Sequence, residues 1–188
     1  PNLVPARVQG LEGQGWRVLS AACHGNKLKT GHLQGNRFRI RIRGTAPGAA
    51  DRARAIARAL AERGLPNAYG PQRFGRGGAN VAVGRALVSG VATPDTSRAR
   101  RDRFLRRLVV SAYQSFLFNR VLAERLRDGV FATALPGDLM KKLETGGLFT
   151  CESPETDGPR LARFEISPTG PMFGHRMMEA KGAAAERE

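Results

Sequence analysis

A long helical pattern between Pro94 and Gly129 restricts the fold of this chain more than any other feature. Residues that suit a buried stripe recur there every three or four positions, as on the inner face of a helix. The stripe consists of Leu105, Leu108, Ala112, Phe116, Asn119, Leu122 and Leu126. Asp95, Thr96 or Ser97 is suited to cap its start, and Gly129 to end it. The pattern predicts one long helix packed on a core, with Asn119 as the one polar member of the stripe.

An alternating segment predicts a strand earlier in the chain. From Asn36 to Arg43, apolar residues fall on one face and arginines on the other, which is the period of a half-buried strand. Ala49 to Arg63 follows with apolar residues at helical spacing, and Gly64 stands at the C′ position. Strand and helix together predict a mixed α/β (α+β) fold.

The rest of the chain is predicted in less detail. Leu65 to Gly90 is rich in glycine and is expected to form a structured connector without a regular helix or central strand. Beyond Gly129 the apolar stretches are short, and Leu161 to Ile166 is the best strand candidate. We place a domain boundary near Gly64.

The charge of the chain indicates an anionic partner. Lys and Arg number 31 against 16 Asp and Glu, a formal net charge of +15, and such an excess favours a phosphate backbone. The alternative is that the Ala, Gly and Arg enrichment of a GC-rich coding sequence leaves many solvated arginines. No apolar run approaches the roughly 20 residues of a membrane span, and no signal peptide is seen at Pro1. We therefore expect a soluble, cytoplasmic protein.

Two further patterns bear on function. Six of the ten residues from Arg98 to Arg107 are arginine. Within one long helix they would lie in the first turns, where positive charge opposes the helix macrodipole, so contact with phosphate explains them better. The only cysteines, Cys23 and Cys151, form no CxxC pair, and we expect reduced, buried thiols without a disulfide framework or a metal site.

Several segments resemble motifs of the TruD family of tRNA pseudouridine synthases, in family order. His24 to Phe38 reads H-G-N-K-L-K-T-G-H-L-Q-G-N-R-F, similar to the family's H-x-N-K-L-x-x-G-H-L-x-G-N-x-F. Pro66 to Gly75 reads P-N-A-Y-G-P-Q-R-F-G, where the family has P-N-Y-F-G-x-Q-R-F-G; Ala68 and Tyr69 replace its usual Tyr-Phe pair. The further matches are Gly78, Asn80, Gly84, Ser111 to Asn119, Gly137-Asp138 and Glu165 to Gly174.

This resemblance implies an isomerase that converts a uridine of tRNA, uridine 13 in the bacterial case, to pseudouridine without cofactor or metal. It implies a partial catalytic domain over residues 1–64 and most of the inserted TRUD domain over residues 65–188, incomplete at its C-terminal end. The family's nucleophilic Asp lies in a G-x-K-D-x-x-A-x-T-x-Q segment before the His24 motif. Only 23 residues precede His24 here, and none is Asp. We therefore expect a fragment that lacks the nucleophile and is inactive alone.

The resemblance also assigns candidate site residues. Asn36 corresponds to the family's active-site asparagine, which orients the carboxylate or holds the substrate; alternatively it starts the strand and bonds a turn. Phe38 borders the uracil pocket or belongs to the core, and Lys27 is the best phosphate contact of its motif. The remaining candidate RNA contacts are Arg73, Arg100, Arg101, Arg103 and Arg107. Arg73, together with Gln72, is also suited to anchoring its glycine-rich loop.

A second hypothesis is a non-catalytic, basic RNA-binding module. It accounts for the charge and for the absent nucleophile equally well. tRNA is the expected partner under the first hypothesis, and RNA under the second.

Overall fold

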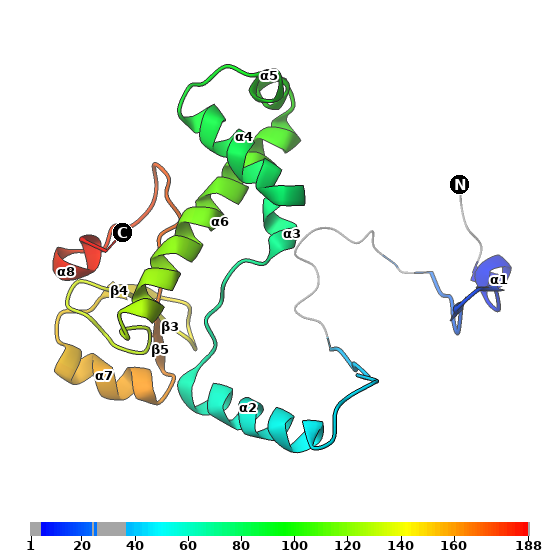
Figure 1. Cartoon of the computed structure of the whole chain (residues 1–188), viewed down its shortest axis with the longest axis horizontal. Coiled ribbons are helices and arrows are strands. Elements are labelled where there is room, and N and C mark those ends of the chain that lie inside the picture. The colour runs from blue at the N-terminus through cyan, green and yellow to red at the C-terminus, as the bar shows by residue number, and fades with distance from the viewer. Residues whose placement is uncertain (1–4, 24, 26–36, 188) are drawn as a thin grey trace. The chain divides into compact units, whose positions relative to one another are not determined.

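The computed structural model describes residues 5–23, 25 and 37–187, which divide into two compact units, residues 1–47 and 48–188 (Figure 1). The described part of the first unit holds one short helix, α1 (Pro5–Val8), and a two-stranded antiparallel sheet of β1 (Glu12–Gly13) and β2 (Trp16–Arg17). The domain boundary placed near Gly64 remains a prediction.

The strand predicted from Asn36 to Arg43 is not formed over its described residues 37–43. Phe38, Ile40 and Ile42 expose 77–78% of their surface. A strand becomes stable when a neighbouring strand pairs with its backbone and a second layer covers its apolar face. The described part of the chain provides neither for this segment, and the prediction was wrong here.

The helix predicted from Ala49 to Arg63 is confirmed as α2 (Ala49–Arg63). Gly64 ends it with φ 81°, a conformation that glycine adopts without strain, and its N–H bonds the carbonyl of Leu60. None of its residues is buried, so its apolar stripe is not covered within this unit.

Leu65 to Gly90 is more regular than predicted. It contains α3 (Pro71–Phe74), the 3-10 turn η1 (Arg76–Gly78) and α4 (Ala79–Val88). Pro71 is suited to the first position of a helix, and Gly75, Gly77 and Gly78 adopt positive φ between the helices. The glycines therefore separate short helices, and the prediction of a connector without a regular helix was wrong.

The long helical pattern is two helices, α5 (Pro94–Arg101) and α6 (Arg103–Arg127). Asp102 adopts an extended conformation between them and caps α6, its carboxylate accepting from the N–H groups of Phe104 and Leu105 at 2.8 and 3.0 Å. Thr93 caps α5 in a reciprocal bond with Thr96. A capping residue thus divides the predicted helix just before its apolar stripe begins.

The buried face of α6 is rotated from the predicted stripe. Ala112 is fully buried as predicted, but Phe116 and Leu126 are exposed. The buried residues are Val109, Ala112, Ser115, Val121 and Arg125. The reason is that α6 packs polar as well as apolar side chains against its neighbours, which a stripe defined mainly by apolar residues does not capture.

The C-terminal part of the second unit is a small sheet with one covering helix. Its antiparallel order is β4-β3-β5, formed by β4 (Leu148–Thr150), β3 (Leu139–Lys142) and β5 (Ile166–Pro168). The covering helix is α7 (Pro154–Ala162), whose Leu161 packs against the core, and a second helix, α8 (Gly182–Ala185), also belongs to this part. The core contains Ala134, Met140, Cys151 and Ile166, with Phe149 and Leu161 packed against it.

The strand predicted from Leu161 to Ile166 begins only at Ile166. Ser153 caps α7, and the helix continues through Leu161 and Ala162. Phe164 then turns the chain with φ 55°. Helices and an antiparallel sheet in one unit confirm the mixed α/β class. Within the described ranges, no helix combines the length and apolar character that a membrane crossing needs.

Gly84 sets the distance between α4 and α6. A Cβ at this position would lie 2.1 Å from the carbonyl oxygen of Val109 and 3.0 Å from the Cβ of Tyr113. Both neighbours belong to α6, and the nearer is backbone. The two helices must separate to admit any side chain.

Gly84→Ala should therefore lower the free energy of unfolding by about 1–3 kcal/mol, the usual cost of overpacking, measured by urea denaturation. Gly158→Ala in α7 is the control, because apart from its chain neighbours a Cβ there meets nothing within 4 Å. The entropic gain of alanine is opposed by Pro159, which disfavours helical backbone at a preceding residue with a Cβ, so stability should stay within about 0.5 kcal/mol of wild type. Equal effects of the two substitutions would contradict the close packing of α4 on α6.

The two cysteines differ. Cys151 is buried as predicted, but Cys23 is exposed. Burial, then a hydrogen bond with Asp157, raises the pKa of Cys151 from 9.0 to about 11. Because only the thiolate is nucleophilic, this thiol is unreactive at neutral pH.

With Cys23 replaced by Ser, alkylation of Cys151 by iodoacetamide should be slow at neutral pH and rise about tenfold per pH unit toward pH 11. With Cys151 replaced by Ser, Cys23 should react readily at neutral pH. Because the folded pKa of Cys151 is the higher one, its contribution to stability should be lost as pH rises from 9 to 11. Equal rates for the two thiols at neutral pH would be inconsistent with a buried Cys151.

Candidate functional site

Three motif segments that are distant in sequence meet along α6. They are the loop and short helix at 66–74, the stretch 111–119 of α6, and the segment 165–174 around β5. We call their meeting point the motif junction. It lies within the second unit, and every residue of it is described.

Asn119 holds the first segment to α6. Its Oδ1 accepts from the N–H of Tyr69 and its Nδ2 donates to the carbonyl of Tyr69, both at 2.9 Å. An amide side chain is suited to this because it carries a donor and an acceptor side by side. The polar member of the predicted helix stripe is therefore a clamp on a loop.

Arg73 makes a second link between the same segments. Its Nε donates to the Ser115 hydroxyl at 3.2 Å, and its Nη2 donates to the Ser111 hydroxyl. Its guanidinium also lies over the ring of Tyr69, 5.6 Å from the centroid. These contacts agree with the anchoring role considered for Arg73, whose contact with RNA remains a prediction.

The third segment reaches the junction through Phe118, Gln114 and Tyr69. Gly170 approaches so closely that a Cβ on it would lie 2.5 Å from the Phe118 ring. Gln114 donates to the carbonyl of Phe173, and the Tyr69 hydroxyl donates to the sulfur of Met172 at 3.8 Å. Tyr69 and Phe118 pack edge to face with centroids 5.5 Å apart. Tyr69 thus contacts all three segments, although it stands at a position where the family pattern is altered.

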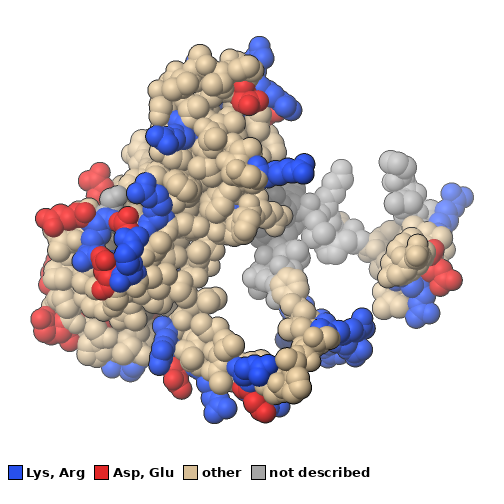
Figure 2. Space-filling model, in the orientation of Figure 1, with Lys and Arg blue, Asp and Glu red and all other residues tan. Residues whose placement is uncertain are grey.

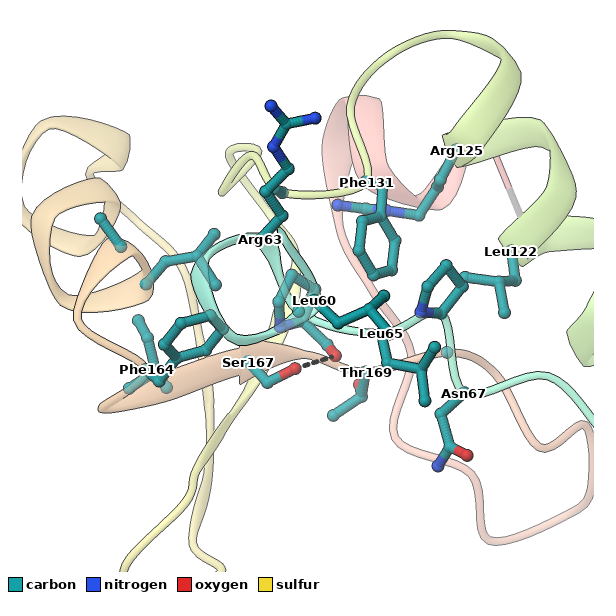
Figure 3. A pocket seen from close by; sticks show the side chains of 18 of the residues that line it. Leu60, Arg63, Leu65, Asn67, Leu122, Arg125, Phe131, Phe164, Ser167 and Thr169 are labelled. Carbon is teal, nitrogen blue, oxygen red and sulfur yellow. Dashed lines mark hydrogen bonds between the residues drawn. The ribbon is translucent and has the colours of Figure 1, made fainter. Parts of the chain in front are cut away.

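Beside the junction lies a pocket of about 910 Å³. Figure 3 shows Leu60, Leu65 and Phe131 around it, with Asn67 and Thr169 as polar neighbours. Its ionisable lining residues are Glu62, Arg63 and Arg125, and Arg125 is already paired with Asp138 at 2.6 Å. Among the described residues that line this pocket, no pair of groups is placed for acid–base chemistry.

The arginine cluster lies at the corner between α5 and α6, and we call it the arginine corner. It comprises Arg98, Arg100, Arg101, Arg103, Arg106 and Arg107, all exposed. Figure 2 shows cationic side chains where α5 lies in the second unit. None of the six forms an ion pair with another described residue.

Because the chain forms two helices that meet at Asp102, the helix macrodipole acts differently on the two halves of the arginine corner. Arg98, Arg100 and Arg101 lie in the last turn of α5, where positive charge is favourable. Arg103, Arg106 and Arg107 lie in the first turns of α6, which has no acidic residue in its first turn. Helix stability accounts for the first three arginines, and only the last three are left unexplained by it.

The predicted site residues fall in different places. Asn36 and Lys27, with His24 and His32, lie outside the described residues. Phe38 belongs to the first unit and is exposed, so it is not part of a core in this chain. Arg73 lies in the motif junction, and the other four predicted arginines lie in the arginine corner. Among the described residues, no group of three or more His, Cys, Asp or Glu side chains is arranged to hold a metal ion.

Sequence reasoning missed the partners inside the junction. Ser111, Gln114, Ser115 and Asn119 are polar residues on a largely apolar helix, and each bonds a motif segment from elsewhere. Their shared positions along one helix were a usable signal, because buried polar side chains require partners.

Comparison with known proteins gives a consistent result. The family model described as tRNA pseudouridine synthase D (TruD) matches residues 1–95 and 95–188. The tRNA pseudouridine synthase D of Anaeromyxobacter dehalogenans strain 2CP-1 is 64% identical over 178 residues, covering 95% of this chain and 50% of that protein. That of Thermus thermophilus is 46% identical over 171 residues, covering 91% and 46%.

A solved structure supports the fold. A crystal structure described as the putative tRNA pseudouridine synthase D (TruD) of Methanosarcina mazei matches with a TM-score of 0.57 at 20% identity, covering 79% of this chain and 50% of that one. This chain thus spans about half the length of the relatives it matches.

Asn119→Asp should lower the free energy of unfolding by about 1–3 kcal/mol. The substitution keeps the acceptor for the Tyr69 N–H but removes the donor to the Tyr69 carbonyl and sets a carboxylate against it. Asn67→Asp is the matched control, because Asn67 is exposed, and it should stay within about 0.5 kcal/mol of wild type. Urea melts measure both, and an Asn119→Asp melt that coincides with the control would refute the clamp.

Proposed function

Because this chain belongs to the tRNA pseudouridine synthase D (TruD) family, we propose that it functions in the isomerisation of a tRNA uridine, uridine 13, to pseudouridine. In this reaction the bond from ribose C1′ to the uracil N1 breaks, the base rotates, and C1′ bonds C5; C5 then loses its proton and N1 gains one, so that the product is an isomer of uridine. A carboxylate near C1′ and a pocket for a flipped-out base are needed. The motif junction is the observation that carries the proposal, because three family motifs meet there in mutual contact.

We assign no nucleophile to this chain, and the structural engagement of its aspartates supports that assignment. Asp138 pairs with Arg125, Asp157 with Arg160, and Asp51 with Arg54. Asp128 pairs with Arg187, and Asp102 caps α6. The sixth, Asp95, lies in the first turn of α5, which is a favourable place for a carboxylate. Each of the six stands where a helix end or a cation explains it.

We propose that this chain supplies binding and orientation. Asn36 orients the carboxylate or holds the substrate, Phe38 borders the uracil, and Lys27 contacts phosphate. These roles rest on the family motif from His24 to Phe38. tRNA is the proposed partner, with binding dominated by phosphate contacts, and the proposed location is the cytoplasm. The proposed reaction uses neither metal nor cofactor.

The direct test uses two proteins and an unmodified tRNA transcript. The 188-residue chain alone should bind tRNA and form no pseudouridine. A chimera of the A. dehalogenans relative, with its matching segment replaced by this chain, should form pseudouridine at uridine 13. Formation by the chain alone would overturn the nucleophile assignment. A folded chimera that binds tRNA but forms none, beside an active parent, would contradict the proposed function.

Asn36→Ala in the chimera should lower the single-turnover rate by about 10²-fold, the usual effect of losing one preorganised polar contact. Affinity for tRNA should stay nearly unchanged, because phosphate contacts elsewhere supply most of the binding. Thermal melts of the same variant provide the control. A full rate with a lowered melting temperature would mean that Asn36 is structural.

A further inference from the structure

Phe104 is an exposed aromatic residue without a structural role in the described fold. It exposes 76% of its surface, more than any other large hydrophobic residue among described residues 48–187. It is the second residue of α6, and its N–H donates to the Asp102 carboxylate at 2.8 Å. The cap therefore fixes its backbone while its ring stays in solvent.

The surroundings of this ring are cationic. Arg103 precedes it, and Arg107 lies three residues further along α6, within reach of the same surface. Arg100 and Arg101 end α5 just before it. Asp102 is the only carboxylate from Arg98 to Arg107, and it is engaged as the helix cap. The arginine corner thus combines one exposed aromatic face with guanidinium groups that no described carboxylate pairs with.

Neither feature alone points to a ligand. Single exposed apolar residues are common on protein surfaces, and three of the arginines stabilise the end of α5. Their combination is different, because an exposed ring costs solubility and the arginines at the start of α6 oppose its dipole. Single-stranded RNA offers the matching chemistry, with flat bases to stack on a ring and phosphates to pair with arginines. A duplex offers its phosphates but not the faces of its bases.

We propose that the arginine corner binds an unpaired segment of RNA, with the Phe104 ring stacked on one base and the flanking arginines on the phosphates. This inference rests on the proposed function, in which the partner is tRNA, and it specifies an unpaired loop or end of that RNA. The site is separate from the motif junction and needs no residue of it.

The experiment measures the affinity of the 188-residue chain for labelled oligouridylate, for an RNA duplex and for inorganic polyphosphate. Phe104→Ala should weaken oligouridylate binding about tenfold, the size expected for one lost stacking contact. Binding to duplex and polyphosphate should not change. Phe104→Trp should retain the affinity and Phe104→Leu should lose it, because leucine is apolar but has no aromatic face. Ile56→Ala is the control, because Ile56 is an exposed apolar residue of α2, a helix that also carries arginines. This variant should bind as wild type.

A charge variant distinguishes base stacking on Phe104 from RNA binding that is driven by charge alone. Replacing Arg100, Arg101, Arg103 and Arg107 with Gln should weaken binding to all three ligands and flatten its dependence on salt. If that variant loses affinity while Phe104→Ala binds oligouridylate normally, the stacking site is wrong and charge-driven binding stands. If neither change affects RNA binding, the corner is not an RNA site, whereas pseudouridine formation by the chimera tests the function independently.

Two other results would also overturn the proposal. One is that Phe104→Ala weakens polyphosphate binding as much as oligouridylate binding. The substitution would then act through folding or charge and not through base stacking. The other is that Phe104→Ala weakens binding to vesicles containing phosphatidylserine while its binding to oligouridylate stays unchanged. That result would make the corner a membrane surface. Thermal melts of Phe104→Ala and Phe104→Leu guard against a folding defect, and Phe104→Trp keeps the test decisive if either of them unfolds.

Discussion

The bidentate pair of Arg125 and Asp138 is the interaction on which the second unit depends. It joins the last turn of α6 to the residue before β3 with bonds of 2.6 and 2.9 Å, and both side chains are buried. Arg125 also donates to the carbonyl of Thr133, and Asp138 accepts from the N–H of Leu135. Removing one partner would leave a buried charge unpaired, which costs more than the pair itself contributes. This pair of hydrogen bonds therefore fixes the sheet against α6, the helix to which the other two motif segments are bonded.

α6 holds together several segments of the second unit and also carries part of the arginine corner. Ser111, Ser115 and Asn119 hold the segment at 66–74, and Gln114 bonds the segment at 165–174. Gly84 of α4 lets that helix pack closely against Val109 and Tyr113 of α6. The first turn of α6 presents Phe104 within the arginine corner. The family motifs in residues 66–174 are thus largely the contacts of a scaffold, and the charges that suit RNA lie on that scaffold's exposed end.

Some local features could be predicted from the sequence, others were predicted wrongly, and the long-range contacts were not predicted. The bounds of α2 followed from apolar spacing and Gly64, and the mixed class followed from a strand and a helix pattern, although that strand is not formed in residues 37–43. The break at Asp102 was missed because the region from Pro94 to Gly129 was read as one helix, and the capping Asp102 lies inside that region just before the apolar stripe begins at Leu105. The junction could not be derived from periodicity, because Asn119 and Tyr69 are 50 residues apart and their bond depends on how α6 meets the loop. The family motifs indicated which segments matter without indicating that they touch.

The central claim is that the arginine corner, between α5 and α6, binds RNA. Ultraviolet crosslinking of bound tRNA tests it most directly, with digestion before aspartate to release the fragments Asp95–Arg101 and Asp102–Arg127. The account predicts crosslinked nucleotides on these two fragments, with Phe104 among the modified residues. Crosslinks confined to α2 or to residues 139–187, with none on either fragment, would contradict it.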